Sequence, residues 1–188
     1  MKKIKCLVVG DGNVGKTSLL ISYCTGRFPE GTTPTKFEKY EAKVKVNDKN
    51  IQLVFIDTSG NGDYDKLRQA SYPDVDVILI CFSVDSKSSF NSLKHRWIPE
   101  TQQYCPNAVT VLVGTKKDIR NKSTDLLNMM SDDESEFIFD DRGRSLAKEF
   151  NAEYVECSAQ TKEGLDSVFE VATMLVLNRH SGNSCQLL

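Results

Sequence analysis

Apolar and polar residues follow one another along this chain in short blocks that predict strands separated by helices. Residues 4–9, 75–84 and 109–113 are mostly apolar runs rich in β-branched side chains, and residues 153–156 form a shorter run. Runs of this length, bounded by turn residues, are typical of strands that are buried on both faces of a parallel sheet. We therefore predict four buried strands.

A hairpin is expected between the first two of these runs. Residues 39–46 have an apolar side chain at every second position, as in an edge strand that is covered on one face only. Turn-forming residues occupy 47–50, and residues 51–56 form the partner strand.

The segments between the strands carry apolar residues at helical spacing. Residues 16–25 follow a glycine-rich turn and are expected to form the first helix. Asp85 and Asp140 are expected helix N-caps. Two later segments each place their large side chains on one helix face: Phe90, Leu93, Trp97 and Ile98 in one, and Leu165, Val168, Phe169, Ala172 and Val176 in the other.

Strands that alternate with helices predict an α/β fold, with a mostly parallel six-stranded sheet, one antiparallel edge strand and helices on both faces. Ligands of such sheets bind beyond the carboxyl ends of the strands, where each motif below is found. We expect one nucleotide-binding domain over residues 1–178 and a flexible tail over 179–188. Residues 121–136 break the alternation and predict an inserted surface helix with an acidic loop.

The composition is that of an ordinary globular domain. Hydrophobic residues make up 39% of the 188 residues, and the net charge of −2 creates no field that would attract nucleic acid. The six cysteines are scattered singly, and we see no secretory leader and no apolar stretch near the roughly 20 residues that span a bilayer. We expect a cytoplasmic monomer without disulfides and without nucleic-acid partners.

Residues 10–17, Gly-Asp-Gly-Asn-Val-Gly-Lys-Thr, match the pattern of a phosphate-binding loop between a strand and a helix. Gly10 and Gly15 let the backbone turn its N–H groups toward an anion, and the helix adds its positive end. Lys16 is expected to reach the β- and γ-phosphates and the Thr17 hydroxyl to hold Mg²⁺. The predicted phosphate contacts come from Gly12, Asn13, Val14, Gly15, Lys16, Thr17 and Ser18.

A phosphate loop alone is compatible with ATPases, kinases and GTPases, and residues 115–118, Thr-Lys-Lys-Asp, favour guanine. Asp118 can accept hydrogen bonds from the N1–H and 2-amino group of guanine. Adenine presents no such pair of donors and would leave the carboxylate desolvated and unpaired. The stem of Lys116 can lie over the base, and a backbone N–H at Ser158-Ala159 can meet the guanine O6.

Three more residues complete the expected site. Asp57 ends a predicted strand, where its carboxylate can hold Mg²⁺ through water, and the N–H of Gly60 is placed to detect the γ-phosphate. Thr35 lies in a polar stretch before the edge strand, where a flexible loop can bring its hydroxyl to the metal. Its spacing from the other motifs does not by itself identify Thr35 as a metal ligand.

These motifs resemble those of the Ras superfamily of small GTPases, and within it the Rho family. The segments that carry the resemblance are GDGNVGKTSLL, PTKFEKY, DTSG, YDKLRQASYPDVDVILICFSV, VLVGTKKDIR, ECSA and a terminal CQLL. The resemblance implies that Phe28 packs edge-on against the guanine and that Thr35 is a metal ligand. It implies that residues 26–40 and 59–72 are two switch segments ordered by the γ-phosphate and Mg²⁺. The insert resembles the helix that marks Rho proteins.

The same resemblance implies partners and a cellular role. The expected partners are guanine-nucleotide exchange factors, GTPase-activating proteins, a GDP-dissociation inhibitor and effectors that bind the two switch segments. The role implied by the family likeness is signalling to the actin cytoskeleton.

The chain departs from the family in the second switch segment, where DTSGNG stands in place of the usual DTAGQE. Asn61 occupies the position of the glutamine that orients the attacking water, and its amide falls short by roughly 1.5 Å. Because a misplacement of about 1 Å can cost 10²-fold in rate, we expect slow GTP hydrolysis with Asn61, Gly60 and Lys16 as catalytic residues. The hydroxyl of Ser59 is expected to hydrogen-bond locally or, as a less favoured alternative, to accept the γ-phosphoryl group.

The last four residues, Cys-Gln-Leu-Leu, fit a prenylation motif whose terminal leucine predicts a geranylgeranyl group on Cys185. Residues 178–184 offer only Arg179 and His180 as cations and no second cysteine. Because one lipid chain anchors reversibly, we expect a cytoplasmic pool and reversible attachment to the inner face of the plasma membrane or to internal membranes.

Two other functions fit parts of the pattern. A chain of the same fold that hydrolyses too slowly to cycle would act as a permanently GTP-bound signalling adaptor, and Asn61 supports this alternative. A P-loop nucleotide kinase is disfavoured, because Asp118 and Thr35 would have no role and no lid with arginines is evident.

Overall fold

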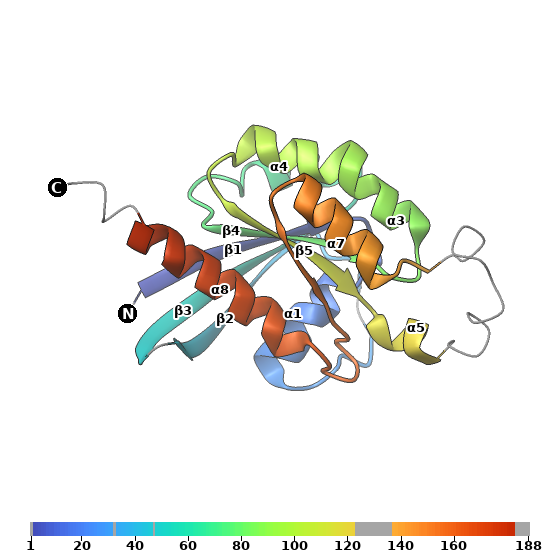
Figure 1. Cartoon of the computed structure of the whole chain (residues 1–188), viewed down its shortest axis with the longest axis horizontal. Helices are drawn as coiled ribbons and strands as arrows, with labels where there is room; N and C mark the ends of the chain where they lie inside the picture. The colour runs from blue at the N-terminus through green and yellow to red at the C-terminus, as the bar shows by residue number, and fades with distance from the viewer. Residues whose placement is uncertain (1, 32, 47, 123–136, 183–188) are drawn as a thin grey trace.

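The computed structural model describes residues 2–31, 33–46, 48–122 and 137–182. In this part of the chain a six-stranded sheet runs through the centre in the order β2-β3-β1-β4-β5-β6 (Figure 1). β2 pairs antiparallel with β3, and the other neighbouring pairs are parallel. The predicted α/β fold with one antiparallel edge strand is confirmed. The strands are β1 (Lys2–Gly10), β2 (Phe37–Val46), β3 (Lys49–Thr58), β4 (Val77–Ser83), β5 (Val109–Thr115) and β6 (Glu153–Glu156).

Helices cover both faces of this sheet (Figure 1). Leu19 and Leu20 of α1 and Phe169 of α8 pack into one core, whereas Trp97 of η2 and Leu146 of α7 pack into the other. The apolar helix faces predicted around Trp97 and Phe169 are both buried. The helices are α1 (Lys16–Thr25), α2 (Asp65–Gln69), α3 (Lys87–Ser92), α4 (Ile98–Tyr104), α5 (Lys117–Lys122), α7 (Asp140–Glu149) and α8 (Leu165–Gly182), with a 3₁₀ turn η1 (Gly62–Tyr64) and a π-helical turn η2 (Leu93–Trp97).

Burial on both faces explains why the central strands are continuous apolar runs. On β1, Cys6 and Val8 point into the core with α1 and α8, whereas Leu7 and Val9 point into the core with α3, α4 and α7. Successive strand side chains face opposite sides, so a strand between two helical layers needs apolar residues at every position.

A π-helical turn interrupts the helical segment that runs from α3 through α4. The N–H of Ile98 donates to the carbonyl of Leu93, five residues earlier, and Pro99 follows at once. Proline has no N–H, and its ring crowds the carbonyl four residues before it. The wider turn accommodates Pro99, and it carries Trp97, which is fully buried.

Several boundaries differ from the sequence-based expectation. Ser86 rather than Asp85 caps α3, accepting a 3.2 Å hydrogen bond from the N–H of Ser89, while the Asp85 carboxylate accepts from the Ser83 hydroxyl. Asp140 is the first residue of α7 and not its N-cap. The two N-cap predictions were therefore wrong by one residue. α8 continues past residue 178 to Gly182, and residues 123–136 of the expected insert lie outside the described residues.

Candidate functional site

The loop between β1 and α1 has a backbone that restricts which residues can occupy it. Gly10 has φ +142°, and a Cβ there would lie 2.2 Å from the carbonyl oxygen of Cys81 on β4. Gly15 has φ +94° and precedes α1, which has no side-chain N-cap and no acidic residue in its first turn. The N–H groups that begin α1 therefore remain available to an external anion.

Lys16 is a buried cation at this loop, with only 7% of its surface exposed. Its ammonium donates to the carbonyl oxygens of Gly10 at 2.8 Å and Asp11 at 2.7 Å. Burial is the main influence on its pKa and lowers it. Among the ion pairs of the described residues, none involves Lys16. A buried ammonium held by carbonyl groups keeps its full attraction for phosphate oxygens.

The phosphate loop opens onto a cavity of about 350 Å³. Most of the residues predicted to contact phosphate or metal line this cavity: Gly12, Asn13, Gly15, Lys16, Thr17, Ser18, Thr35 and Gly60. Asn61, predicted to orient the attacking water, and Lys116, predicted to lie over the base, line it as well. Val14 differs, because its side chain is 2% exposed and packs into the core. Only the backbone of Val14 remains to serve a ligand.

Thr17, which lines this cavity together with Thr35, contacts the buried Asp57, although the three residues come from α1, a loop and β3. The Thr17 hydroxyl lies 2.7 Å from the Thr35 hydroxyl and donates to Asp57 Oδ2 at 2.5 Å. Asp57 is fully buried, its Oδ1 has no hydrogen-bond partner among the described residues, and burial is the main cause that raises its pKa. An orphaned carboxylate oxygen beside two hydroxyls fits Mg²⁺, a hard cation that prefers oxygen ligands.

A second cavity of about 130 Å³ adjoins the first, and Gly15, Ser18 and Lys116 line both. Phe28, Asp118 and Ala159, which we expect to contact the guanine base, also line this cavity. Phe28 is 46% exposed, so a large apolar ring is left open at the cavity mouth. Lys116 has φ +59°, a left-handed backbone conformation that is uncommon for lysine.

Asp118 is held in a fixed orientation in this second cavity. It is 6% exposed, and the Ser158 hydroxyl donates to its Oδ1 at 2.6 Å. The backbone N–H of Ser158 donates to the carbonyl of Glu163 at 2.9 Å and is not free for a ligand. Of the two predicted donors to the guanine O6, the geometry therefore favours the N–H of Ala159.

The second switch segment carries Ser59 and Asn61, two of the three residues at which DTSGNG departs from the family pattern. Asn61 caps η1, since its side-chain oxygen accepts from the N–H of Asp63 at 3.1 Å and its amide nitrogen donates to the Asp63 carboxylate at 3.2 Å. The Ser59 hydroxyl accepts from the N–H of Asn61 at 3.2 Å, so the expected local hydrogen bond is present. A Cβ on Gly60 would lie 2.5 Å from the carbonyl oxygen of Gly10, so this wall closely abuts the loop.

Two contacts of the site were not anticipated from the sequence. The Thr115 hydroxyl donates to the carbonyls of Val14 and, at 2.9 Å, Phe82, which ties the end of β5 to the phosphate loop. The indole N–H of Trp97 donates to Asp11 Oδ1 at 2.8 Å. The periodicity places Trp97 in the core, but no local pattern indicates which loop its N–H would reach.

The arrangement agrees with comparisons to known proteins. A profile described as the Ras family matches residues 5–178. The Rho-related GTP-binding protein RhoB from Homo sapiens, and the RhoB proteins from Mus musculus and Rattus norvegicus, are each 45% identical to this chain over 194 aligned residues. Each alignment covers 98% of this chain and 97% of the relative. The chain belongs to the Ras family, in its Rho branch.

Members of the Rho family are small GTPases that bind GTP, GDP and Mg²⁺, and the candidate site provides places for each of these ligands. The described residues include no group of three or more His, Cys, Asp and Glu side chains that could hold a metal. A site built from two hydroxyls and one carboxylate agrees with that finding. No helix in the described part of the chain is long and apolar enough to cross a membrane.

Proposed function

We propose that this Rho-family protein binds GTP and GDP with Mg²⁺, hydrolyses GTP slowly and signals through two nucleotide-dependent switch segments. The observation that carries the proposal is the meeting of Lys16, the Thr17–Asp57 pair and Asp118 around two adjoining cavities. Lys16 and the loop N–H groups suit a polyphosphate, and Asp118 suits the paired donors of guanine.

Each residue has a defined task in this reaction. Lys16 stabilises negative charge on the β- and γ-phosphates, and the N–H of Gly60 responds to the presence of the γ-phosphate. Thr17 and Thr35 would hold Mg²⁺ directly and Asp57 through water. The bound metal would supply neutralisation of charge on the β- and γ-oxygens. Loss of the γ-phosphate removes the group that the N–H of Gly60 detects and that orders both switch segments together with Mg²⁺, which releases the two segments.

The side-chain contacts of Asn61 support slow hydrolysis. Its amide is one methylene shorter than glutamine, and both of its polar atoms are engaged with Asp63 at the start of η1. Orienting a water for attack requires that the amide leave this cap and then reach farther than its length allows. Gly12 leaves open space beside the loop, since a Cβ there would meet no atom within 4 Å. An activating protein could therefore still insert an arginine.

A permanently GTP-bound signalling adaptor is the second candidate, and the cap formed by Asn61 is the observation that favours it. One experiment separates the two functions. The nucleotide extracted from freshly purified protein is identified by chromatography, and single-turnover hydrolysis is then followed with and without an activating protein. Mixed GDP and GTP with measurable turnover supports the slow GTPase. GTP alone with no turnover in either condition supports the adaptor, and binding of neither nucleotide refutes both.

The membrane role depends on Cys185, which lies outside the described residues. We propose geranylgeranylation of Cys185, reversible attachment to the inner face of the plasma membrane or to internal membranes, and a cytoplasmic pool bound to a GDP-dissociation inhibitor. Exchange factors, activating proteins and effectors at the switch segments, with signalling to actin, are proposed from family membership. Cell fractionation tests the attachment: Cys185→Ser should become wholly soluble, and a fully membrane-bound wild type would contradict reversibility.

A further inference from the structure

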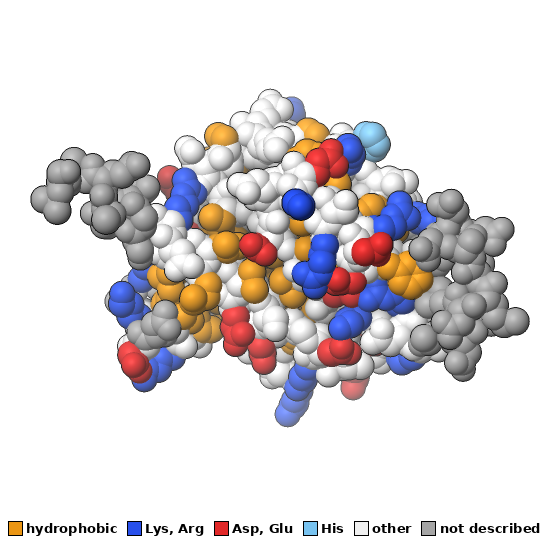
Figure 2. All heavy atoms as spheres, in the orientation of Figure 1, with side chains coloured by type: hydrophobic (Ala, Val, Ile, Leu, Met, Phe, Trp, Pro, Cys, Tyr) orange, Lys and Arg blue, Asp and Glu red, His pale blue; other side chains and the backbone are white. Residues whose placement is uncertain are grey.

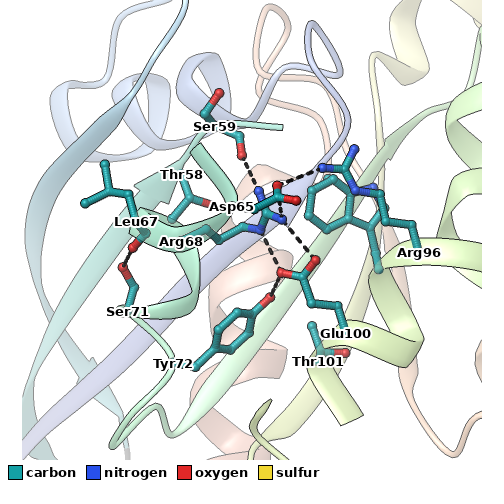
Figure 3. Close-up of polar contacts among 12 residues, drawn as sticks. Thr58, Ser59, Asp65, Leu67, Arg68, Ser71, Tyr72, Arg96, Glu100 and Thr101 are labelled. Carbon is teal, nitrogen blue, oxygen red and sulfur yellow. Dashed lines mark hydrogen bonds and ion pairs between the residues drawn. The ribbon is translucent and has the colours of Figure 1, made fainter. Parts of the chain in front are cut away.

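Arg68 on α2 carries a charge into the interior, outside the nucleotide cavities, and is 1% exposed. Its guanidinium donates to both carboxylate oxygens of Glu100 on α4, at 2.7 and 2.9 Å, and to Asp65 at 2.7 Å (Figure 3). Tyr72 donates to the same Glu100 carboxylate at 2.8 Å. Arg68 also donates to the carbonyl oxygen of Ser59 at 3.1 Å. The segment leading into Gly60 is thus fastened to a buried ion-pair cluster.

Trp97 lies against this cluster and connects it with the phosphate loop. The guanidinium carbon of Arg68 is 4.8 Å from the centre of the Trp97 ring, and that of Arg96 is 4.4 Å away. Both arginines donate to the same oxygen of Asp65 (Figure 3). The indole N–H donates to Asp11, whose own carbonyl receives the Lys16 ammonium. Trp97 therefore holds the residue that helps to hold Lys16.

The two ends of this chain of contacts meet at the phosphate cavity. Asp11 belongs to the phosphate loop, and its neighbour Gly12 lines the cavity together with Ser59 and Gly60. The two segments are already close, because a Cβ on Gly60 would lie 2.5 Å from the backbone of Asp11 and from the nitrogen of Gly12. Arg68 thus contacts Ser59 and Trp97 contacts Asp11, while the two side chains stack on each other.

We propose that Arg68 and Trp97 act as one positioning unit that fixes the distance between Ser59–Gly60 and the phosphate loop, and so favours retention of GTP over GDP. The inference rests on the proposed function, because it assumes that the γ-phosphate contacts both Gly60 and the phosphate loop. Glu100 anchors the unit to α4, and Asp11 is its contact with the loop. Loss of the Glu100 contact or of the Asp11 contact loosens the same spacing. Removing both contacts should therefore weaken GTP retention little more than removing one.

A double-mutant cycle tests this coupling. Dissociation of a fluorescent, non-hydrolysable GTP analogue and of fluorescent GDP is measured for wild type, Asp11→Ala, Glu100→Gln and the double variant. Each single change should speed analogue release about tenfold, the size of one hydrogen bond to a charged group, and GDP release less. The double variant should stay within about threefold of the faster single variant. Effects that multiply to about hundredfold would overturn the inference.

The control is Glu149→Gln, which removes a carboxylate as Glu100→Gln does but lies outside the Arg68–Trp97 unit. Glu149 accepts from Lys94 at 2.8 Å in a half-exposed pair on the same side of the sheet. Glu149→Gln should leave both release rates unchanged and should be additive with Asp11→Ala. If Glu100→Gln does not fold, Tyr72→Phe, which removes one hydrogen bond from the same carboxylate, replaces it in the cycle.

Fluorescence gives a readout that a merely structural role would not change. Trp97 is the only tryptophan of the chain, so tryptophan emission comes from this residue alone. Exchange of GDP for the GTP analogue should shift the emission of wild type and should not shift that of Asp11→Ala. The shift should return in Asp11→Asn, whose amide oxygen can accept from the indole. Identical shifts in all three proteins would overturn the inference. Failure of wild type to bind either nucleotide would instead refute the proposed function.

Discussion

The Ser158 hydroxyl donates a 2.6 Å hydrogen bond to Asp118 Oδ1, so a residue of α5, which follows β5, and a residue of the loop after β6 form one buried pair. The bond fixes the plane of the Asp118 carboxylate within the smaller cavity. Its second oxygen, Oδ2, lies 3.4 Å from the ammonium of Lys122, a side chain that is 65% exposed. A carboxylate held this way is preorganised to accept hydrogen bonds from a base that presents two donors.

This pair gives a prediction about nucleotide selection. Asp118→Ala should abolish the preference for GTP over ATP and weaken GTP binding by about 10²-fold or more, because the paired donors of guanine lose their acceptor. Competition between the two nucleotides for a fluorescent analogue measures the effect. Ser158→Ala is the matched control and should weaken GTP by only about tenfold, since the acceptor stays in place. A preference that survives Asp118→Ala would contradict the assignment of the base site.

Hydrolysis should respond to the length of the side chain at position 61. Asn61→Gln should raise the single-turnover rate by about 10- to 100-fold, because the added methylene restores the reach toward the attacking water. Rapid quench of preloaded, GTP-bound protein measures the rate.

A second variant separates reach from engagement in the cap. Asp63→Ala removes the carboxylate that holds the Asn61 amide nitrogen, keeps the backbone N–H that donates to the Asn61 oxygen, and does not lengthen the side chain. Hydrolysis should therefore remain within about twofold of wild type if reach is the limit. A rate for Asp63→Ala that matches Asn61→Gln would show that the contact with the Asp63 carboxylate, and not the length of the side chain, slows the reaction.

The buried carboxyl of Asp57 predicts a linkage between pH, metal and stability. Its pKa is raised above the ordinary value of 3.8, mainly by burial, so folding favours the uncharged form. Without Mg²⁺, Asp57 therefore stabilises the fold most at low pH, and that contribution is lost as the pH rises through the raised pKa. Bound Mg²⁺ pairs with the charge and should offset the loss. Chemical denaturation with and without Mg²⁺ should show this difference in wild type and not in Asp57→Asn.

The strands and the loops that carry the nucleotide motifs were predictable, because each is specified by residues close together in the sequence. Burial on both faces makes β1 and β4 nearly continuous apolar runs, and the glycine and lysine positions of the phosphate loop follow from its backbone and charge. The same local logic placed Asp118 at the end of β5, where it lines the smaller cavity. Each prediction needed only a short window of sequence.

The features that the sequence did not predict depend on competition between neighbouring residues or on contacts between residues far apart in the chain. Asp85 and Ser86 can both cap α3, and the choice is made by Ser83, whose hydroxyl engages Asp85. The bond from Trp97 to Asp11 joins residues 86 positions apart, and Trp97 itself lies in a π turn before Pro99. No pattern within either segment specifies the other.

Gly143 on α7 gives a stability prediction whose sign opposes helix propensity. Glycine to alanine inside a helix ordinarily stabilises by about 0.5–1 kcal/mol. Here a Cβ would lie 2.1 Å from Cζ of Tyr154, a ring that is 6% exposed and whose hydroxyl donates to Glu156 at 2.7 Å. The ring cannot yield without losing that bond, so Gly143→Ala should destabilise the GDP-bound protein by about 1–3 kcal/mol in urea denaturation. In a Tyr154→Leu background the obstruction is gone, and the same substitution should become neutral or stabilising. Stabilisation by Gly143→Ala in the wild-type background would mean that α7 and β6 pack less closely than described.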